Sequence, residues 1–345
     1  GLSCALQLRN RFPKAKILVL EKGVLPQGAS TKNAGFACFG SLSEIIDDLK
    51  THTEEEVVEL VKRRVDGLHL LKHTLGEVQI NYQELGGYEL FPETEMTLFQ
   101  ECLSQRERIN QLLKPIFNAE VFSLKENVFQ FKNIHKQYIF NQFEGQIDTG
   151  NMMDALLREA QSKDIKILNN VTVENYLEGI NSVHLKCNLF DFSTSKLLIA
   201  TNGFASQLIS QNVKPARAQV LITNPINDLH IKGTFHLDRG YYYFRNINDR
   251  ILFGGGRNLD FKTEETTAFA STELVQNKLE ELLKTTIIPD TPFEIEQRWS
   301  GIMGVGNQKK AIVKQVSNHV YCGVRLGGMG VAIGSLVGKE LADLL

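Results

Sequence analysis

The chain has 345 residues, of which 42% are hydrophobic and 23% are charged. Lysine and arginine number 38 and the acidic residues 40, which gives a formal net charge of −2. This balance provides no basic surface for nucleic acid, and no apolar run reaches the ~18 residues that a membrane-spanning helix needs. The composition therefore favours a globular protein with a large core, no nucleic-acid partner and no membrane span.

The cysteines are scattered and odd in number, and no two of them form a Cys-x-x-Cys pair. They are Cys4, Cys38, Cys102, Cys187 and Cys322. Such a distribution argues against a structural zinc site and for a reducing, cytoplasmic compartment.

The first 35 residues have the order of a nucleotide-binding unit: a helix over 1–11, a strand over 17–20 and a loop rich in small residues. Gly1 stands at the helix start and Glu21 follows the strand, at the spacing of a close-packing glycine and a ribose-binding acid. The strand and the two glycines that precede such a helix are missing from the sequence. We therefore expect the chain to be a fragment of a longer reading frame.

Two capping boxes follow, Ser41 with Glu44 and Thr53 with Glu56, each typical of a helix start. The second introduces an amphipathic helix over 54–75, because its apolar residues recur every three or four positions.

His69 and His73 lie four residues apart on this helix and have the spacing of a metal pair. Without a third ligand nearby, such a pair is weak evidence for a metal. A solvated helix face is the better interpretation, and we predict no metal site in the chain.

The middle of the chain alternates helices and strands, which favours an α/β sheet. Expected strands lie at 78–82, 128–131, 138–143, 165–168, 171–177 and 196–200, and expected helices at 96–113 and 151–162. Residues 78–145 interrupt this alternation and have the character of an inserted region.

Beyond residue 214 the pattern changes to period-two strands, which are typical of an antiparallel sheet. These strands are expected at 218–223, 241–245, 251–254 and 293–298, with a helix at 272–283. A last strand over 320–323 precedes a glycine-rich turn and a helix that continues to residue 345.

Several segments in this order resemble the D-amino-acid oxidase family of FAD-dependent oxidoreductases, which includes glycine and sarcosine oxidases and amino-acid dehydrogenases. The segments are 28–35, 145–168, 200–203, 240–245 with 254–256, 299–301 and 327–338. The resemblance covers essentially the whole chain.

It implies an α/β fold with a discontinuous, Rossmann-like FAD-binding domain over 1–77, 146–213 and 301–345. The central parallel sheet of that domain would lack its first strand. Residues 78–145 and 214–300 would form an antiparallel-sheet (α+β) substrate domain.

The resemblance also implies which residues contact FAD. They are Gly1, Glu21, Lys22, Gly28, Ala29, Ser30, Thr31, Asn33, Ala34, Gly35, Val171, Ala200, Thr201, Asn202, Gly203, Arg325, Gly327, Gly328, Met329, Gly330 and Val331. Glu21 would bind the ribose hydroxyls, and the helix that follows the last glycines would point its free amides at the flavin edge. A solvated acid, a plain turn and close helix packing are the respective alternatives. Neither Cys38 nor Cys322 aligns with a flavin-attaching residue, so the resemblance implies non-covalent FAD.

On the substrate side, the resemblance assigns catalytic positions to Tyr242, Tyr243, Arg245, Trp299 and Arg325. Strand alternation sends Tyr243 and Arg245 to one face and Tyr242 to the other. Only one set can face the flavin, and the sequence leaves open which; ordinary sheet packing is the alternative for each aromatic residue.

Many family members carry an arginine after Trp-x-Gly that binds the substrate carboxylate, whereas this chain has Ile302 and Met303. Arg325 could replace that arginine as a bidentate partner, and Arg245 or Arg257 are weaker candidates. Arg217 matches the family's Pro-x-Arg motif and is as readily structural.

The implied activity is oxidation of a C–N bond in a small amine or amino-acid-like substrate, by hydride transfer to flavin N5 and hydrolysis of the resulting imine. A catalytically silent member of the fold is the main alternative. An NAD-dependent dehydrogenase is a third interpretation, but it leaves the glycines of 327–338 unexplained.

Overall fold

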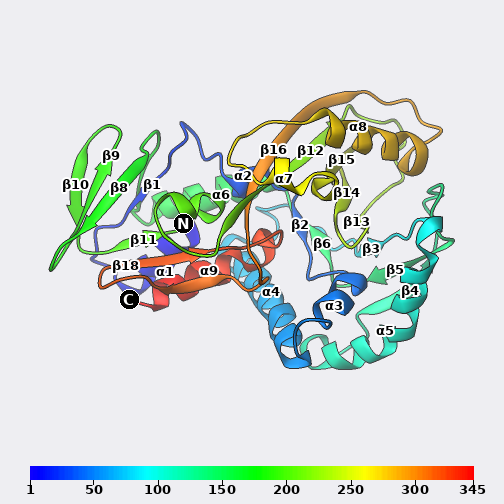
Figure 1. Ribbon diagram of the computed structural model, residues 1–345, viewed down its shortest axis with the longest axis horizontal. Helices are drawn as coiled ribbons and strands as arrows, with labels where there is room; N and C mark the ends of the chain where they lie inside the picture. The colour runs from blue at the N-terminus through cyan, green and yellow to red at the C-terminus, as the bar shows by residue number, and fades with distance from the viewer.

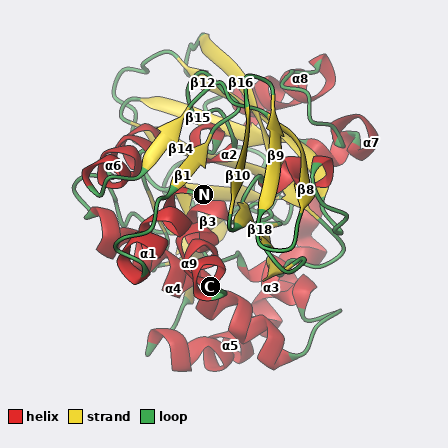
Figure 2. Ribbon diagram, turned by 90° about the vertical axis from the view of Figure 1, so that its left-hand side faces the viewer, coloured by secondary structure: helices red, strands yellow, loops and turns green.

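The computed structural model describes all 345 residues and places the central parallel strands at one end of the molecule and a large sheet at the other (Figure 1). The helices near the first end are α1 (Leu2–Arg11), α4 (Glu54–Leu75), α6 (Thr149–Ser162) and α9 (Gly330–Asp343). Seen from the side, most helices lie below the strands, with α5 (Met96–Phe117) at the bottom of the view (Figure 2). No helix is both long enough and apolar enough to span a membrane.

The predicted central sheet is present in two separate pieces. Strand β1 (Leu18–Leu20) pairs in parallel with β7 (Lys166–Leu168). Strand β11 (Leu197–Ile199) pairs in parallel with β18 (Val320–Val324). Strand β17 (Ile312–Gln315) pairs antiparallel with the other edge of β18. No hydrogen bonds join the two pieces. The outer edges of β1 and β11 therefore pair with no other strand.

A three-stranded antiparallel sheet covers the end of this region. Its strands are β8 (Val173–Glu178), β9 (Val183–Cys187) and β10 (Asp191–Thr194), in the order β10-β9-β8. The sequence predicted only the first of them. Alternating burial along β9 shows that one face packs on the core and the other is solvated.

The large sheet has eight strands in the order β16-β12-β15-β14-β13-β3-β5-β4. They are β3 (Gly87–Glu89), β4 (Phe122–Glu126), β5 (Gln137–Asn141), β12 (Lys214–Thr223), β13 (Thr234–Leu237), β14 (Tyr242–Ile247), β15 (Arg250–Gly255) and β16 (Ile295–Val305). Every pairing is antiparallel except that of β13 with β3. Strands from two distant parts of the chain thus form one continuous sheet.

Short elements complete the fold and connect its two ends. They are α2 (Ala29–Lys32), α3 (Leu42–Asp48), α7 (Phe261–Glu264) and α8 (Glu273–Leu282), the helical turns Glu93–Glu95, Asn202–Gln207, Arg257–Leu259 and Leu283–Ile287, and the strand pair β2 (Phe36–Ala37) with β6 (Gly145–Gln146). Both predicted capping boxes are present, at the starts of α3 and α4.

Two strand predictions are wrong. Residues 78–82 form a turn, because Gly76 ends α4 with a φ of 84° and Asn81 has a φ of 48°. Residues 128–131 also turn, since Gln130 has a φ of 59° and the side chain of Asn127 binds both backbone groups of Phe131. Residues 78–82 alternate apolar and polar and 128–131 are mostly apolar, but left-handed backbone positions prevented an extended strand in both.

Candidate functional site

A single large cavity of about 1240 Å³ connects the two ends of the molecule, which exceeds the usual 300–1,000 Å³ of a small-molecule pocket. It extends between β1 and β11, passes the 28–35 loop and the start of α9, and reaches β14. All the predicted cofactor residues line it except Gly203. That glycine packs against backbone instead, since a Cβ there would lie 2.5 Å from the carbonyl oxygen of Met303.

At the β1 end of the cavity, Glu21 is fixed by the turn that follows it. Its carboxylate accepts a hydrogen bond of 2.7 Å from the amide of Gly23. The backbone carbonyl of Glu21 accepts another, of 3.0 Å, from the amide of Val171. The two residues predicted to meet the adenosine half are therefore joined directly, although they are far apart in sequence.

The loop at 28–35 is ordered by the side chain of Asn33. Its amide group donates to the carbonyls of Ala29 and Ser30, and its carbonyl oxygen accepts from the amide of Gly35. Thr149, at the start of α6, donates to the same side-chain oxygen at 3.0 Å. This closed network holds the loop in one shape and leaves Gly28 facing open space, with no atom within 4 Å of an added Cβ.

Helix α9 begins at the cavity wall without a side-chain cap and without an acidic residue in its first turn. The preceding turn requires Gly327, which has a φ of 59°. The side chain of Asn202 accepts a hydrogen bond of 3.1 Å from the amide of Leu326, so the 200–203 segment supports this turn. The first amides of α9 and the positive end of its dipole thus face the cavity.

Strand β14 carries three of the predicted catalytic residues, Tyr242, Tyr243 and Arg245, and directs them to its two faces. Tyr242 packs into the core on the far side of the sheet. Tyr243 lines the cavity, and its ring meets Phe36 edge to face at 5.6 Å. Burial raises the pKa of Tyr243 to about 12, so its hydroxyl stays neutral at physiological pH. The sequence left open which face of β14 meets the cavity, and it is the face that carries Tyr243.

Trp299 and Arg245 lie on the Tyr243 side but just behind the cavity wall. The indole of Trp299 donates a 3.0 Å hydrogen bond to the carbonyl of Lys32 and so holds the end of α2. Arg245 is buried beneath Gly35, and its Nε has no hydrogen-bond partner. Burial lowers its pKa to about 10, although Asp148 acts in the opposite direction.

Arg325 lines the cavity but directs its guanidinium to the backbone. Nε and Nη2 both donate to the carbonyl of Lys310, at 3.0 and 2.8 Å, and Nη1 donates to the carbonyl of Asn212. Burial lowers its pKa. Because these bonds use all three nitrogens, the geometry favours a supporting role over capture of a substrate carboxylate.

Arg217 has the structural role that the sequence allowed for it. Its guanidinium forms a bidentate, buried pair with Glu264, with distances of 2.7 and 2.8 Å. Gln219 donates to the same carboxylate at 2.8 Å. This network joins α7 to the middle of β12.

Comparison with known proteins then identifies the family. The family described as DAO, FAD dependent oxidoreductase, matches residues 1–344. The chain belongs to this family. It is an FAD-dependent oxidoreductase.

Individual DAO-family relatives and flavoenzyme structures are distant in sequence. The probable oxidoreductase OrdL of Haemophilus influenzae is 20% identical over 364 residues, which cover 100% of this chain and 80% of that protein. L-proline dehydrogenase from P. horikoshii superposes with a TM-score of 0.77 at 17% identity, covering 100% of this chain and 90% of that one. Glycine oxidase from Geobacillus kaustophilus gives 0.77 at 16% identity, with coverages of 100% and 91%. These superpositions confirm the predicted α/β fold.

The residues of this DAO-family chain fit FAD. Glu21 offers a carboxylate, the start of α9 offers free amides, and Gly28 and Gly327 have no atom within 4 Å of an added Cβ. Close approach of a ligand to backbone requires such positions. Tyr243 and Phe36 provide an aromatic wall at the opposite end.

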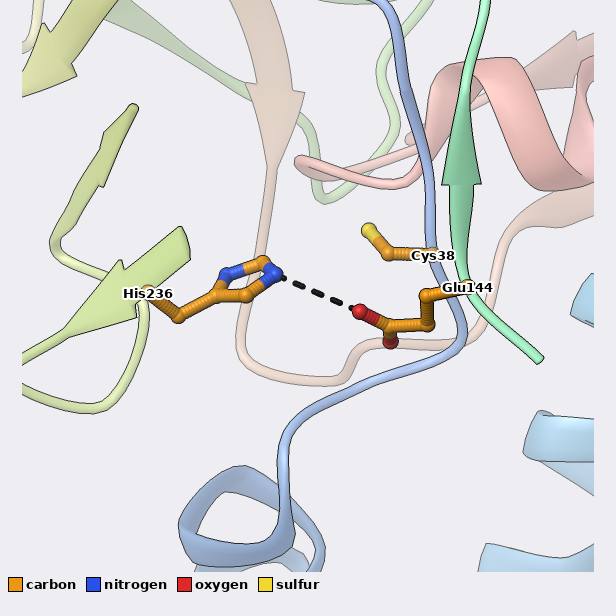
Figure 3. A group of neighbouring side chains, drawn as sticks. All are labelled: Cys38, Glu144 and His236. Carbon is orange, nitrogen blue, oxygen red and sulfur yellow. Dashed lines mark ion pairs between the residues drawn. The ribbon is translucent and has the colours of Figure 1, made fainter. Parts of the chain in front are cut away.

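Sequence reasoning missed a buried group beside the Tyr243 end. Cys38 follows β2, Glu144 precedes β6 and His236 lies on β13, and their side chains point toward one another (Figure 3). Burial, and then the negative charges of Glu144 and Glu44, raise the pKa of the Cys38 thiol well above its ordinary value. Burial alone would lower the pKa of His236, but Glu144, together with the charges of Glu44 and Glu89, raises it overall.

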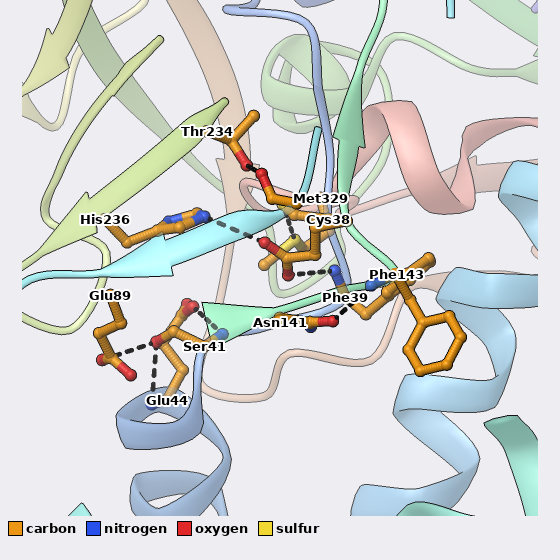
Figure 4. Close-up of polar contacts among 12 residues, drawn as sticks. Cys38, Phe39, Ser41, Glu44, Glu89, Asn141, Phe143, Thr234, His236 and Met329 are labelled. Atoms are coloured by element: carbon orange, nitrogen blue, oxygen red, sulfur yellow. Dashed lines mark hydrogen bonds and ion pairs between the residues drawn. The ribbon is translucent and has the colours of Figure 1, made fainter. Parts of the chain in front are cut away.

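A second carboxylate network adjoins this group (Figure 4). Glu89, on β3, accepts hydrogen bonds from the hydroxyls of Ser41 and Ser43 and from the amide of Ser43. Burial raises its pKa despite these donors. No short motif marks these residues, because they come from separate strands and loops; the one sequence signal was the Ser41 capping box.

The His69 and His73 pair lies away from this group. Both side chains are exposed on α4, as the solvated-face interpretation predicted.

Proposed function

We propose that this oxidoreductase oxidises a C–N bond of a small amine or amino-acid-like substrate and holds FAD without a covalent link. The observation that carries the proposal is the continuous cavity from Glu21 to Tyr243. Its two ends suit the two halves of the cofactor. One end offers the carboxylate of Glu21 and the other an aromatic wall, and the first amides of α9 face the cavity nearer the second end, where Met329 contacts Cys38.

The proposed domains follow the same division. Residues 1–77, 146–213 and 301–345 would form the FAD-binding domain, and 78–145 with 214–300 the substrate domain. The eight-stranded sheet supports this assignment, because seven of its strands lie within the latter two ranges and β16 begins there and continues to Val305.

When bound, FAD supplies the group that accepts a hydride from the carbon bearing an unprotonated amine. Water then hydrolyses the imine product. The chain's own part is to position the substrate and to exclude water. Tyr243 lines the cavity with a neutral side chain, and the rings of Tyr243 and Phe36 form one wall. The first amides of α9 lie where they would stabilise developing negative charge, by about 0.3–1 kcal/mol at an exposed helix end.

The test is anaerobic mixing of the FAD-loaded protein with a panel of amines, N-methyl amino acids and D-amino acids. Loss of flavin absorbance with at least one member is the expected result. Flavin that stays oxidised with every member would overturn amine oxidation. Inability to bind FAD at all would instead favour the catalytically silent fold.

Tyr243→Phe provides the matched variant for this assay. If the hydroxyl contacts substrate, its removal lowers the rate of bleaching while FAD stays bound. Tyr242→Phe is the control, because Tyr242 lies on the opposite face of β14.

A further inference from the structure

Three potential metal ligands converge beneath the wall of the cavity. The Sγ of Cys38, a carboxylate oxygen of Glu144 and a ring nitrogen of His236 all lie within 4.8 Å of one another (Figure 3). The three side chains are 5%, 1% and 5% exposed. The strand pair β2–β6 explains part of this arrangement, since Ala37 pairs with Gly145 and so brings Cys38 and Glu144 side by side.

The Nε2 of His236 lacks a hydrogen-bond partner although it is fully buried. It points at the Oε2 of Glu144 from 3.5 Å, a contact that qualifies as an ion pair but not as a hydrogen bond. A buried polar atom without a partner is costly and requires an explanation. A ligand between the two side chains would provide one.

The other carboxylate oxygen of Glu144 is already held by the protein. Oε1 accepts a 3.0 Å hydrogen bond from the amide of Phe39 (Figure 4). This bond orients Oε2 toward His236 and Cys38. Such support of a ligand by a further hydrogen bond is typical of metal sites.

The charges around the group also favour a cation. Glu144 and Glu44 both act on Cys38, and Arg64 is the one positive group acting on it. The guanidinium of Arg64 is partly committed elsewhere, since Nη1 donates to the carbonyl of Phe39. A buried carboxylate such as that of Glu144 is unfavourable unless a positive group accompanies it, and a metal ion would supply that charge.

We propose that Cys38, Glu144 and His236 bind one divalent transition-metal ion of the zinc type. Thiolate, imidazole and carboxylate are the ligands that zinc accepts. Binding replaces the proton of the Cys38 thiol, which passes to solvent, and forms a metal–sulfur bond. Three protein ligands leave a fourth position open. Because Cys38 and His236 line the large cavity, that position faces it and takes a water molecule or another oxygen donor.

The test measures zinc bound to the full-length chain after incubation with Zn²⁺ and removal of free metal on a chelating resin. We expect about one zinc ion per chain in the wild type. Cys38→Ala and His236→Gln should weaken zinc binding at least about tenfold. Cys322→Ala is the matched control, because Cys322 is an equally buried free cysteine outside the cavity, and it should keep the full zinc content.

A wild-type chain that retains no zinc, or a Cys38→Ala variant that retains as much as the wild type, would overturn the proposal. The group would then be a metal-free ion pair of His236 with Glu144. Glu144→Gln keeps the side-chain volume and provides a second variant should His236→Gln fold poorly. Zinc should raise the melting temperature of the wild type and not of Glu144→Gln. Zinc content is measured without flavin or substrate, so its failure is separate from any failure of the proposed oxidation.

Discussion

The two ends of the cavity are formed by different kinds of chemical groups. From the β1 end as far as the start of α9, glycines, backbone amides and one carboxylate form the wall, and helices α4 and α9 approach so closely that Gly67 touches the carbonyl of Ala332. Beside the β14 end, the large sheet carries buried side-chain pairs, such as Arg217 of β12 with Glu264 of α7 and His236 of β13 with Glu144. The first end therefore depends on backbone geometry, and the second depends on paired side chains.

This contrast is tested most strongly by breaking a side-chain pair in the large sheet. Glu264→Gln leaves the buried guanidinium of Arg217 without its partner charge, and should lower the free energy of unfolding by about 3–5 kcal/mol. Urea denaturation followed by circular dichroism measures this change. Glu296→Gln is the control, since its pair with Arg250 is partly exposed and such pairs contribute about 0–1 kcal/mol. Equal losses in both variants would contradict a special role for the buried pair.

At the backbone-built end, the corresponding change adds a single methyl group. Gly67→Ala would place a Cβ 2.2 Å from the carbonyl oxygen of Ala332, so α4 and α9 must separate. We expect a loss of about 1–3 kcal/mol in the free energy of unfolding, measured by urea denaturation. The control is Gly179→Ala, where the nearest atom is 3.5 Å away. If Gly67→Ala is as stable as Gly179→Ala, the two helices are less tightly fixed than the structure shows.

FAD binding at the β1 end should depend on one charge, that of Glu21. Glu21→Gln keeps the hydrogen bond to Gly23 possible but removes the negative charge that would accept the ribose hydroxyls. Loss of a charged hydrogen bond of about 1.5 kcal/mol corresponds to roughly tenfold weaker FAD binding. Titration by flavin fluorescence measures it, with Glu77→Gln, a solvated acid outside the cavity, as the control. Unchanged affinity would assign Glu21 to the turn alone.

The smallest expected effect is a pH dependence at Glu89. Burial raises its folded pKa above the ordinary value of 4.5. Protonated Glu89 therefore stabilises the fold fully below pH 4.5, its unfolded pKa. This stabilisation is lost as the pH rises through the folded pKa. Glu89→Gln stays neutral throughout, so its melting temperature relative to the wild type should increase from pH 4.5 upward. A constant difference across that range would show that Glu89 ionises normally.

Much of the local backbone structure could be predicted from the sequence. Short motifs encode local conformation directly: the capping boxes of α3 and α4, the Asn33 loop and the glycines before α9 all formed where their spacing indicated. The orientation of β14 could not be predicted, because strand alternation defines two faces without stating which one meets the cavity.

The side-chain networks could not be predicted, because their members meet only through long-range strand pairing. Strand β13 was missed because it has only four residues, and because its polar Thr234 and His236 are as buried as its apolar residues. His236 lies on this strand, and its partners Cys38 and Glu144 lie on separate loops. Conversely, residues 78–82 alternate as a strand does but contain Asn81 at a positive φ.

The central claim is that the cavity holds FAD between Glu21 and Tyr243. It is tested most directly by titrating the purified chain with FAD and, separately, with NAD⁺, and by measuring the bound cofactor after ultrafiltration. The account predicts binding of about one FAD per chain, with no comparable binding of NAD⁺, and release of the flavin on denaturation because it is held without a covalent bond. A chain that binds NAD⁺ but not FAD, or that binds neither, would contradict it.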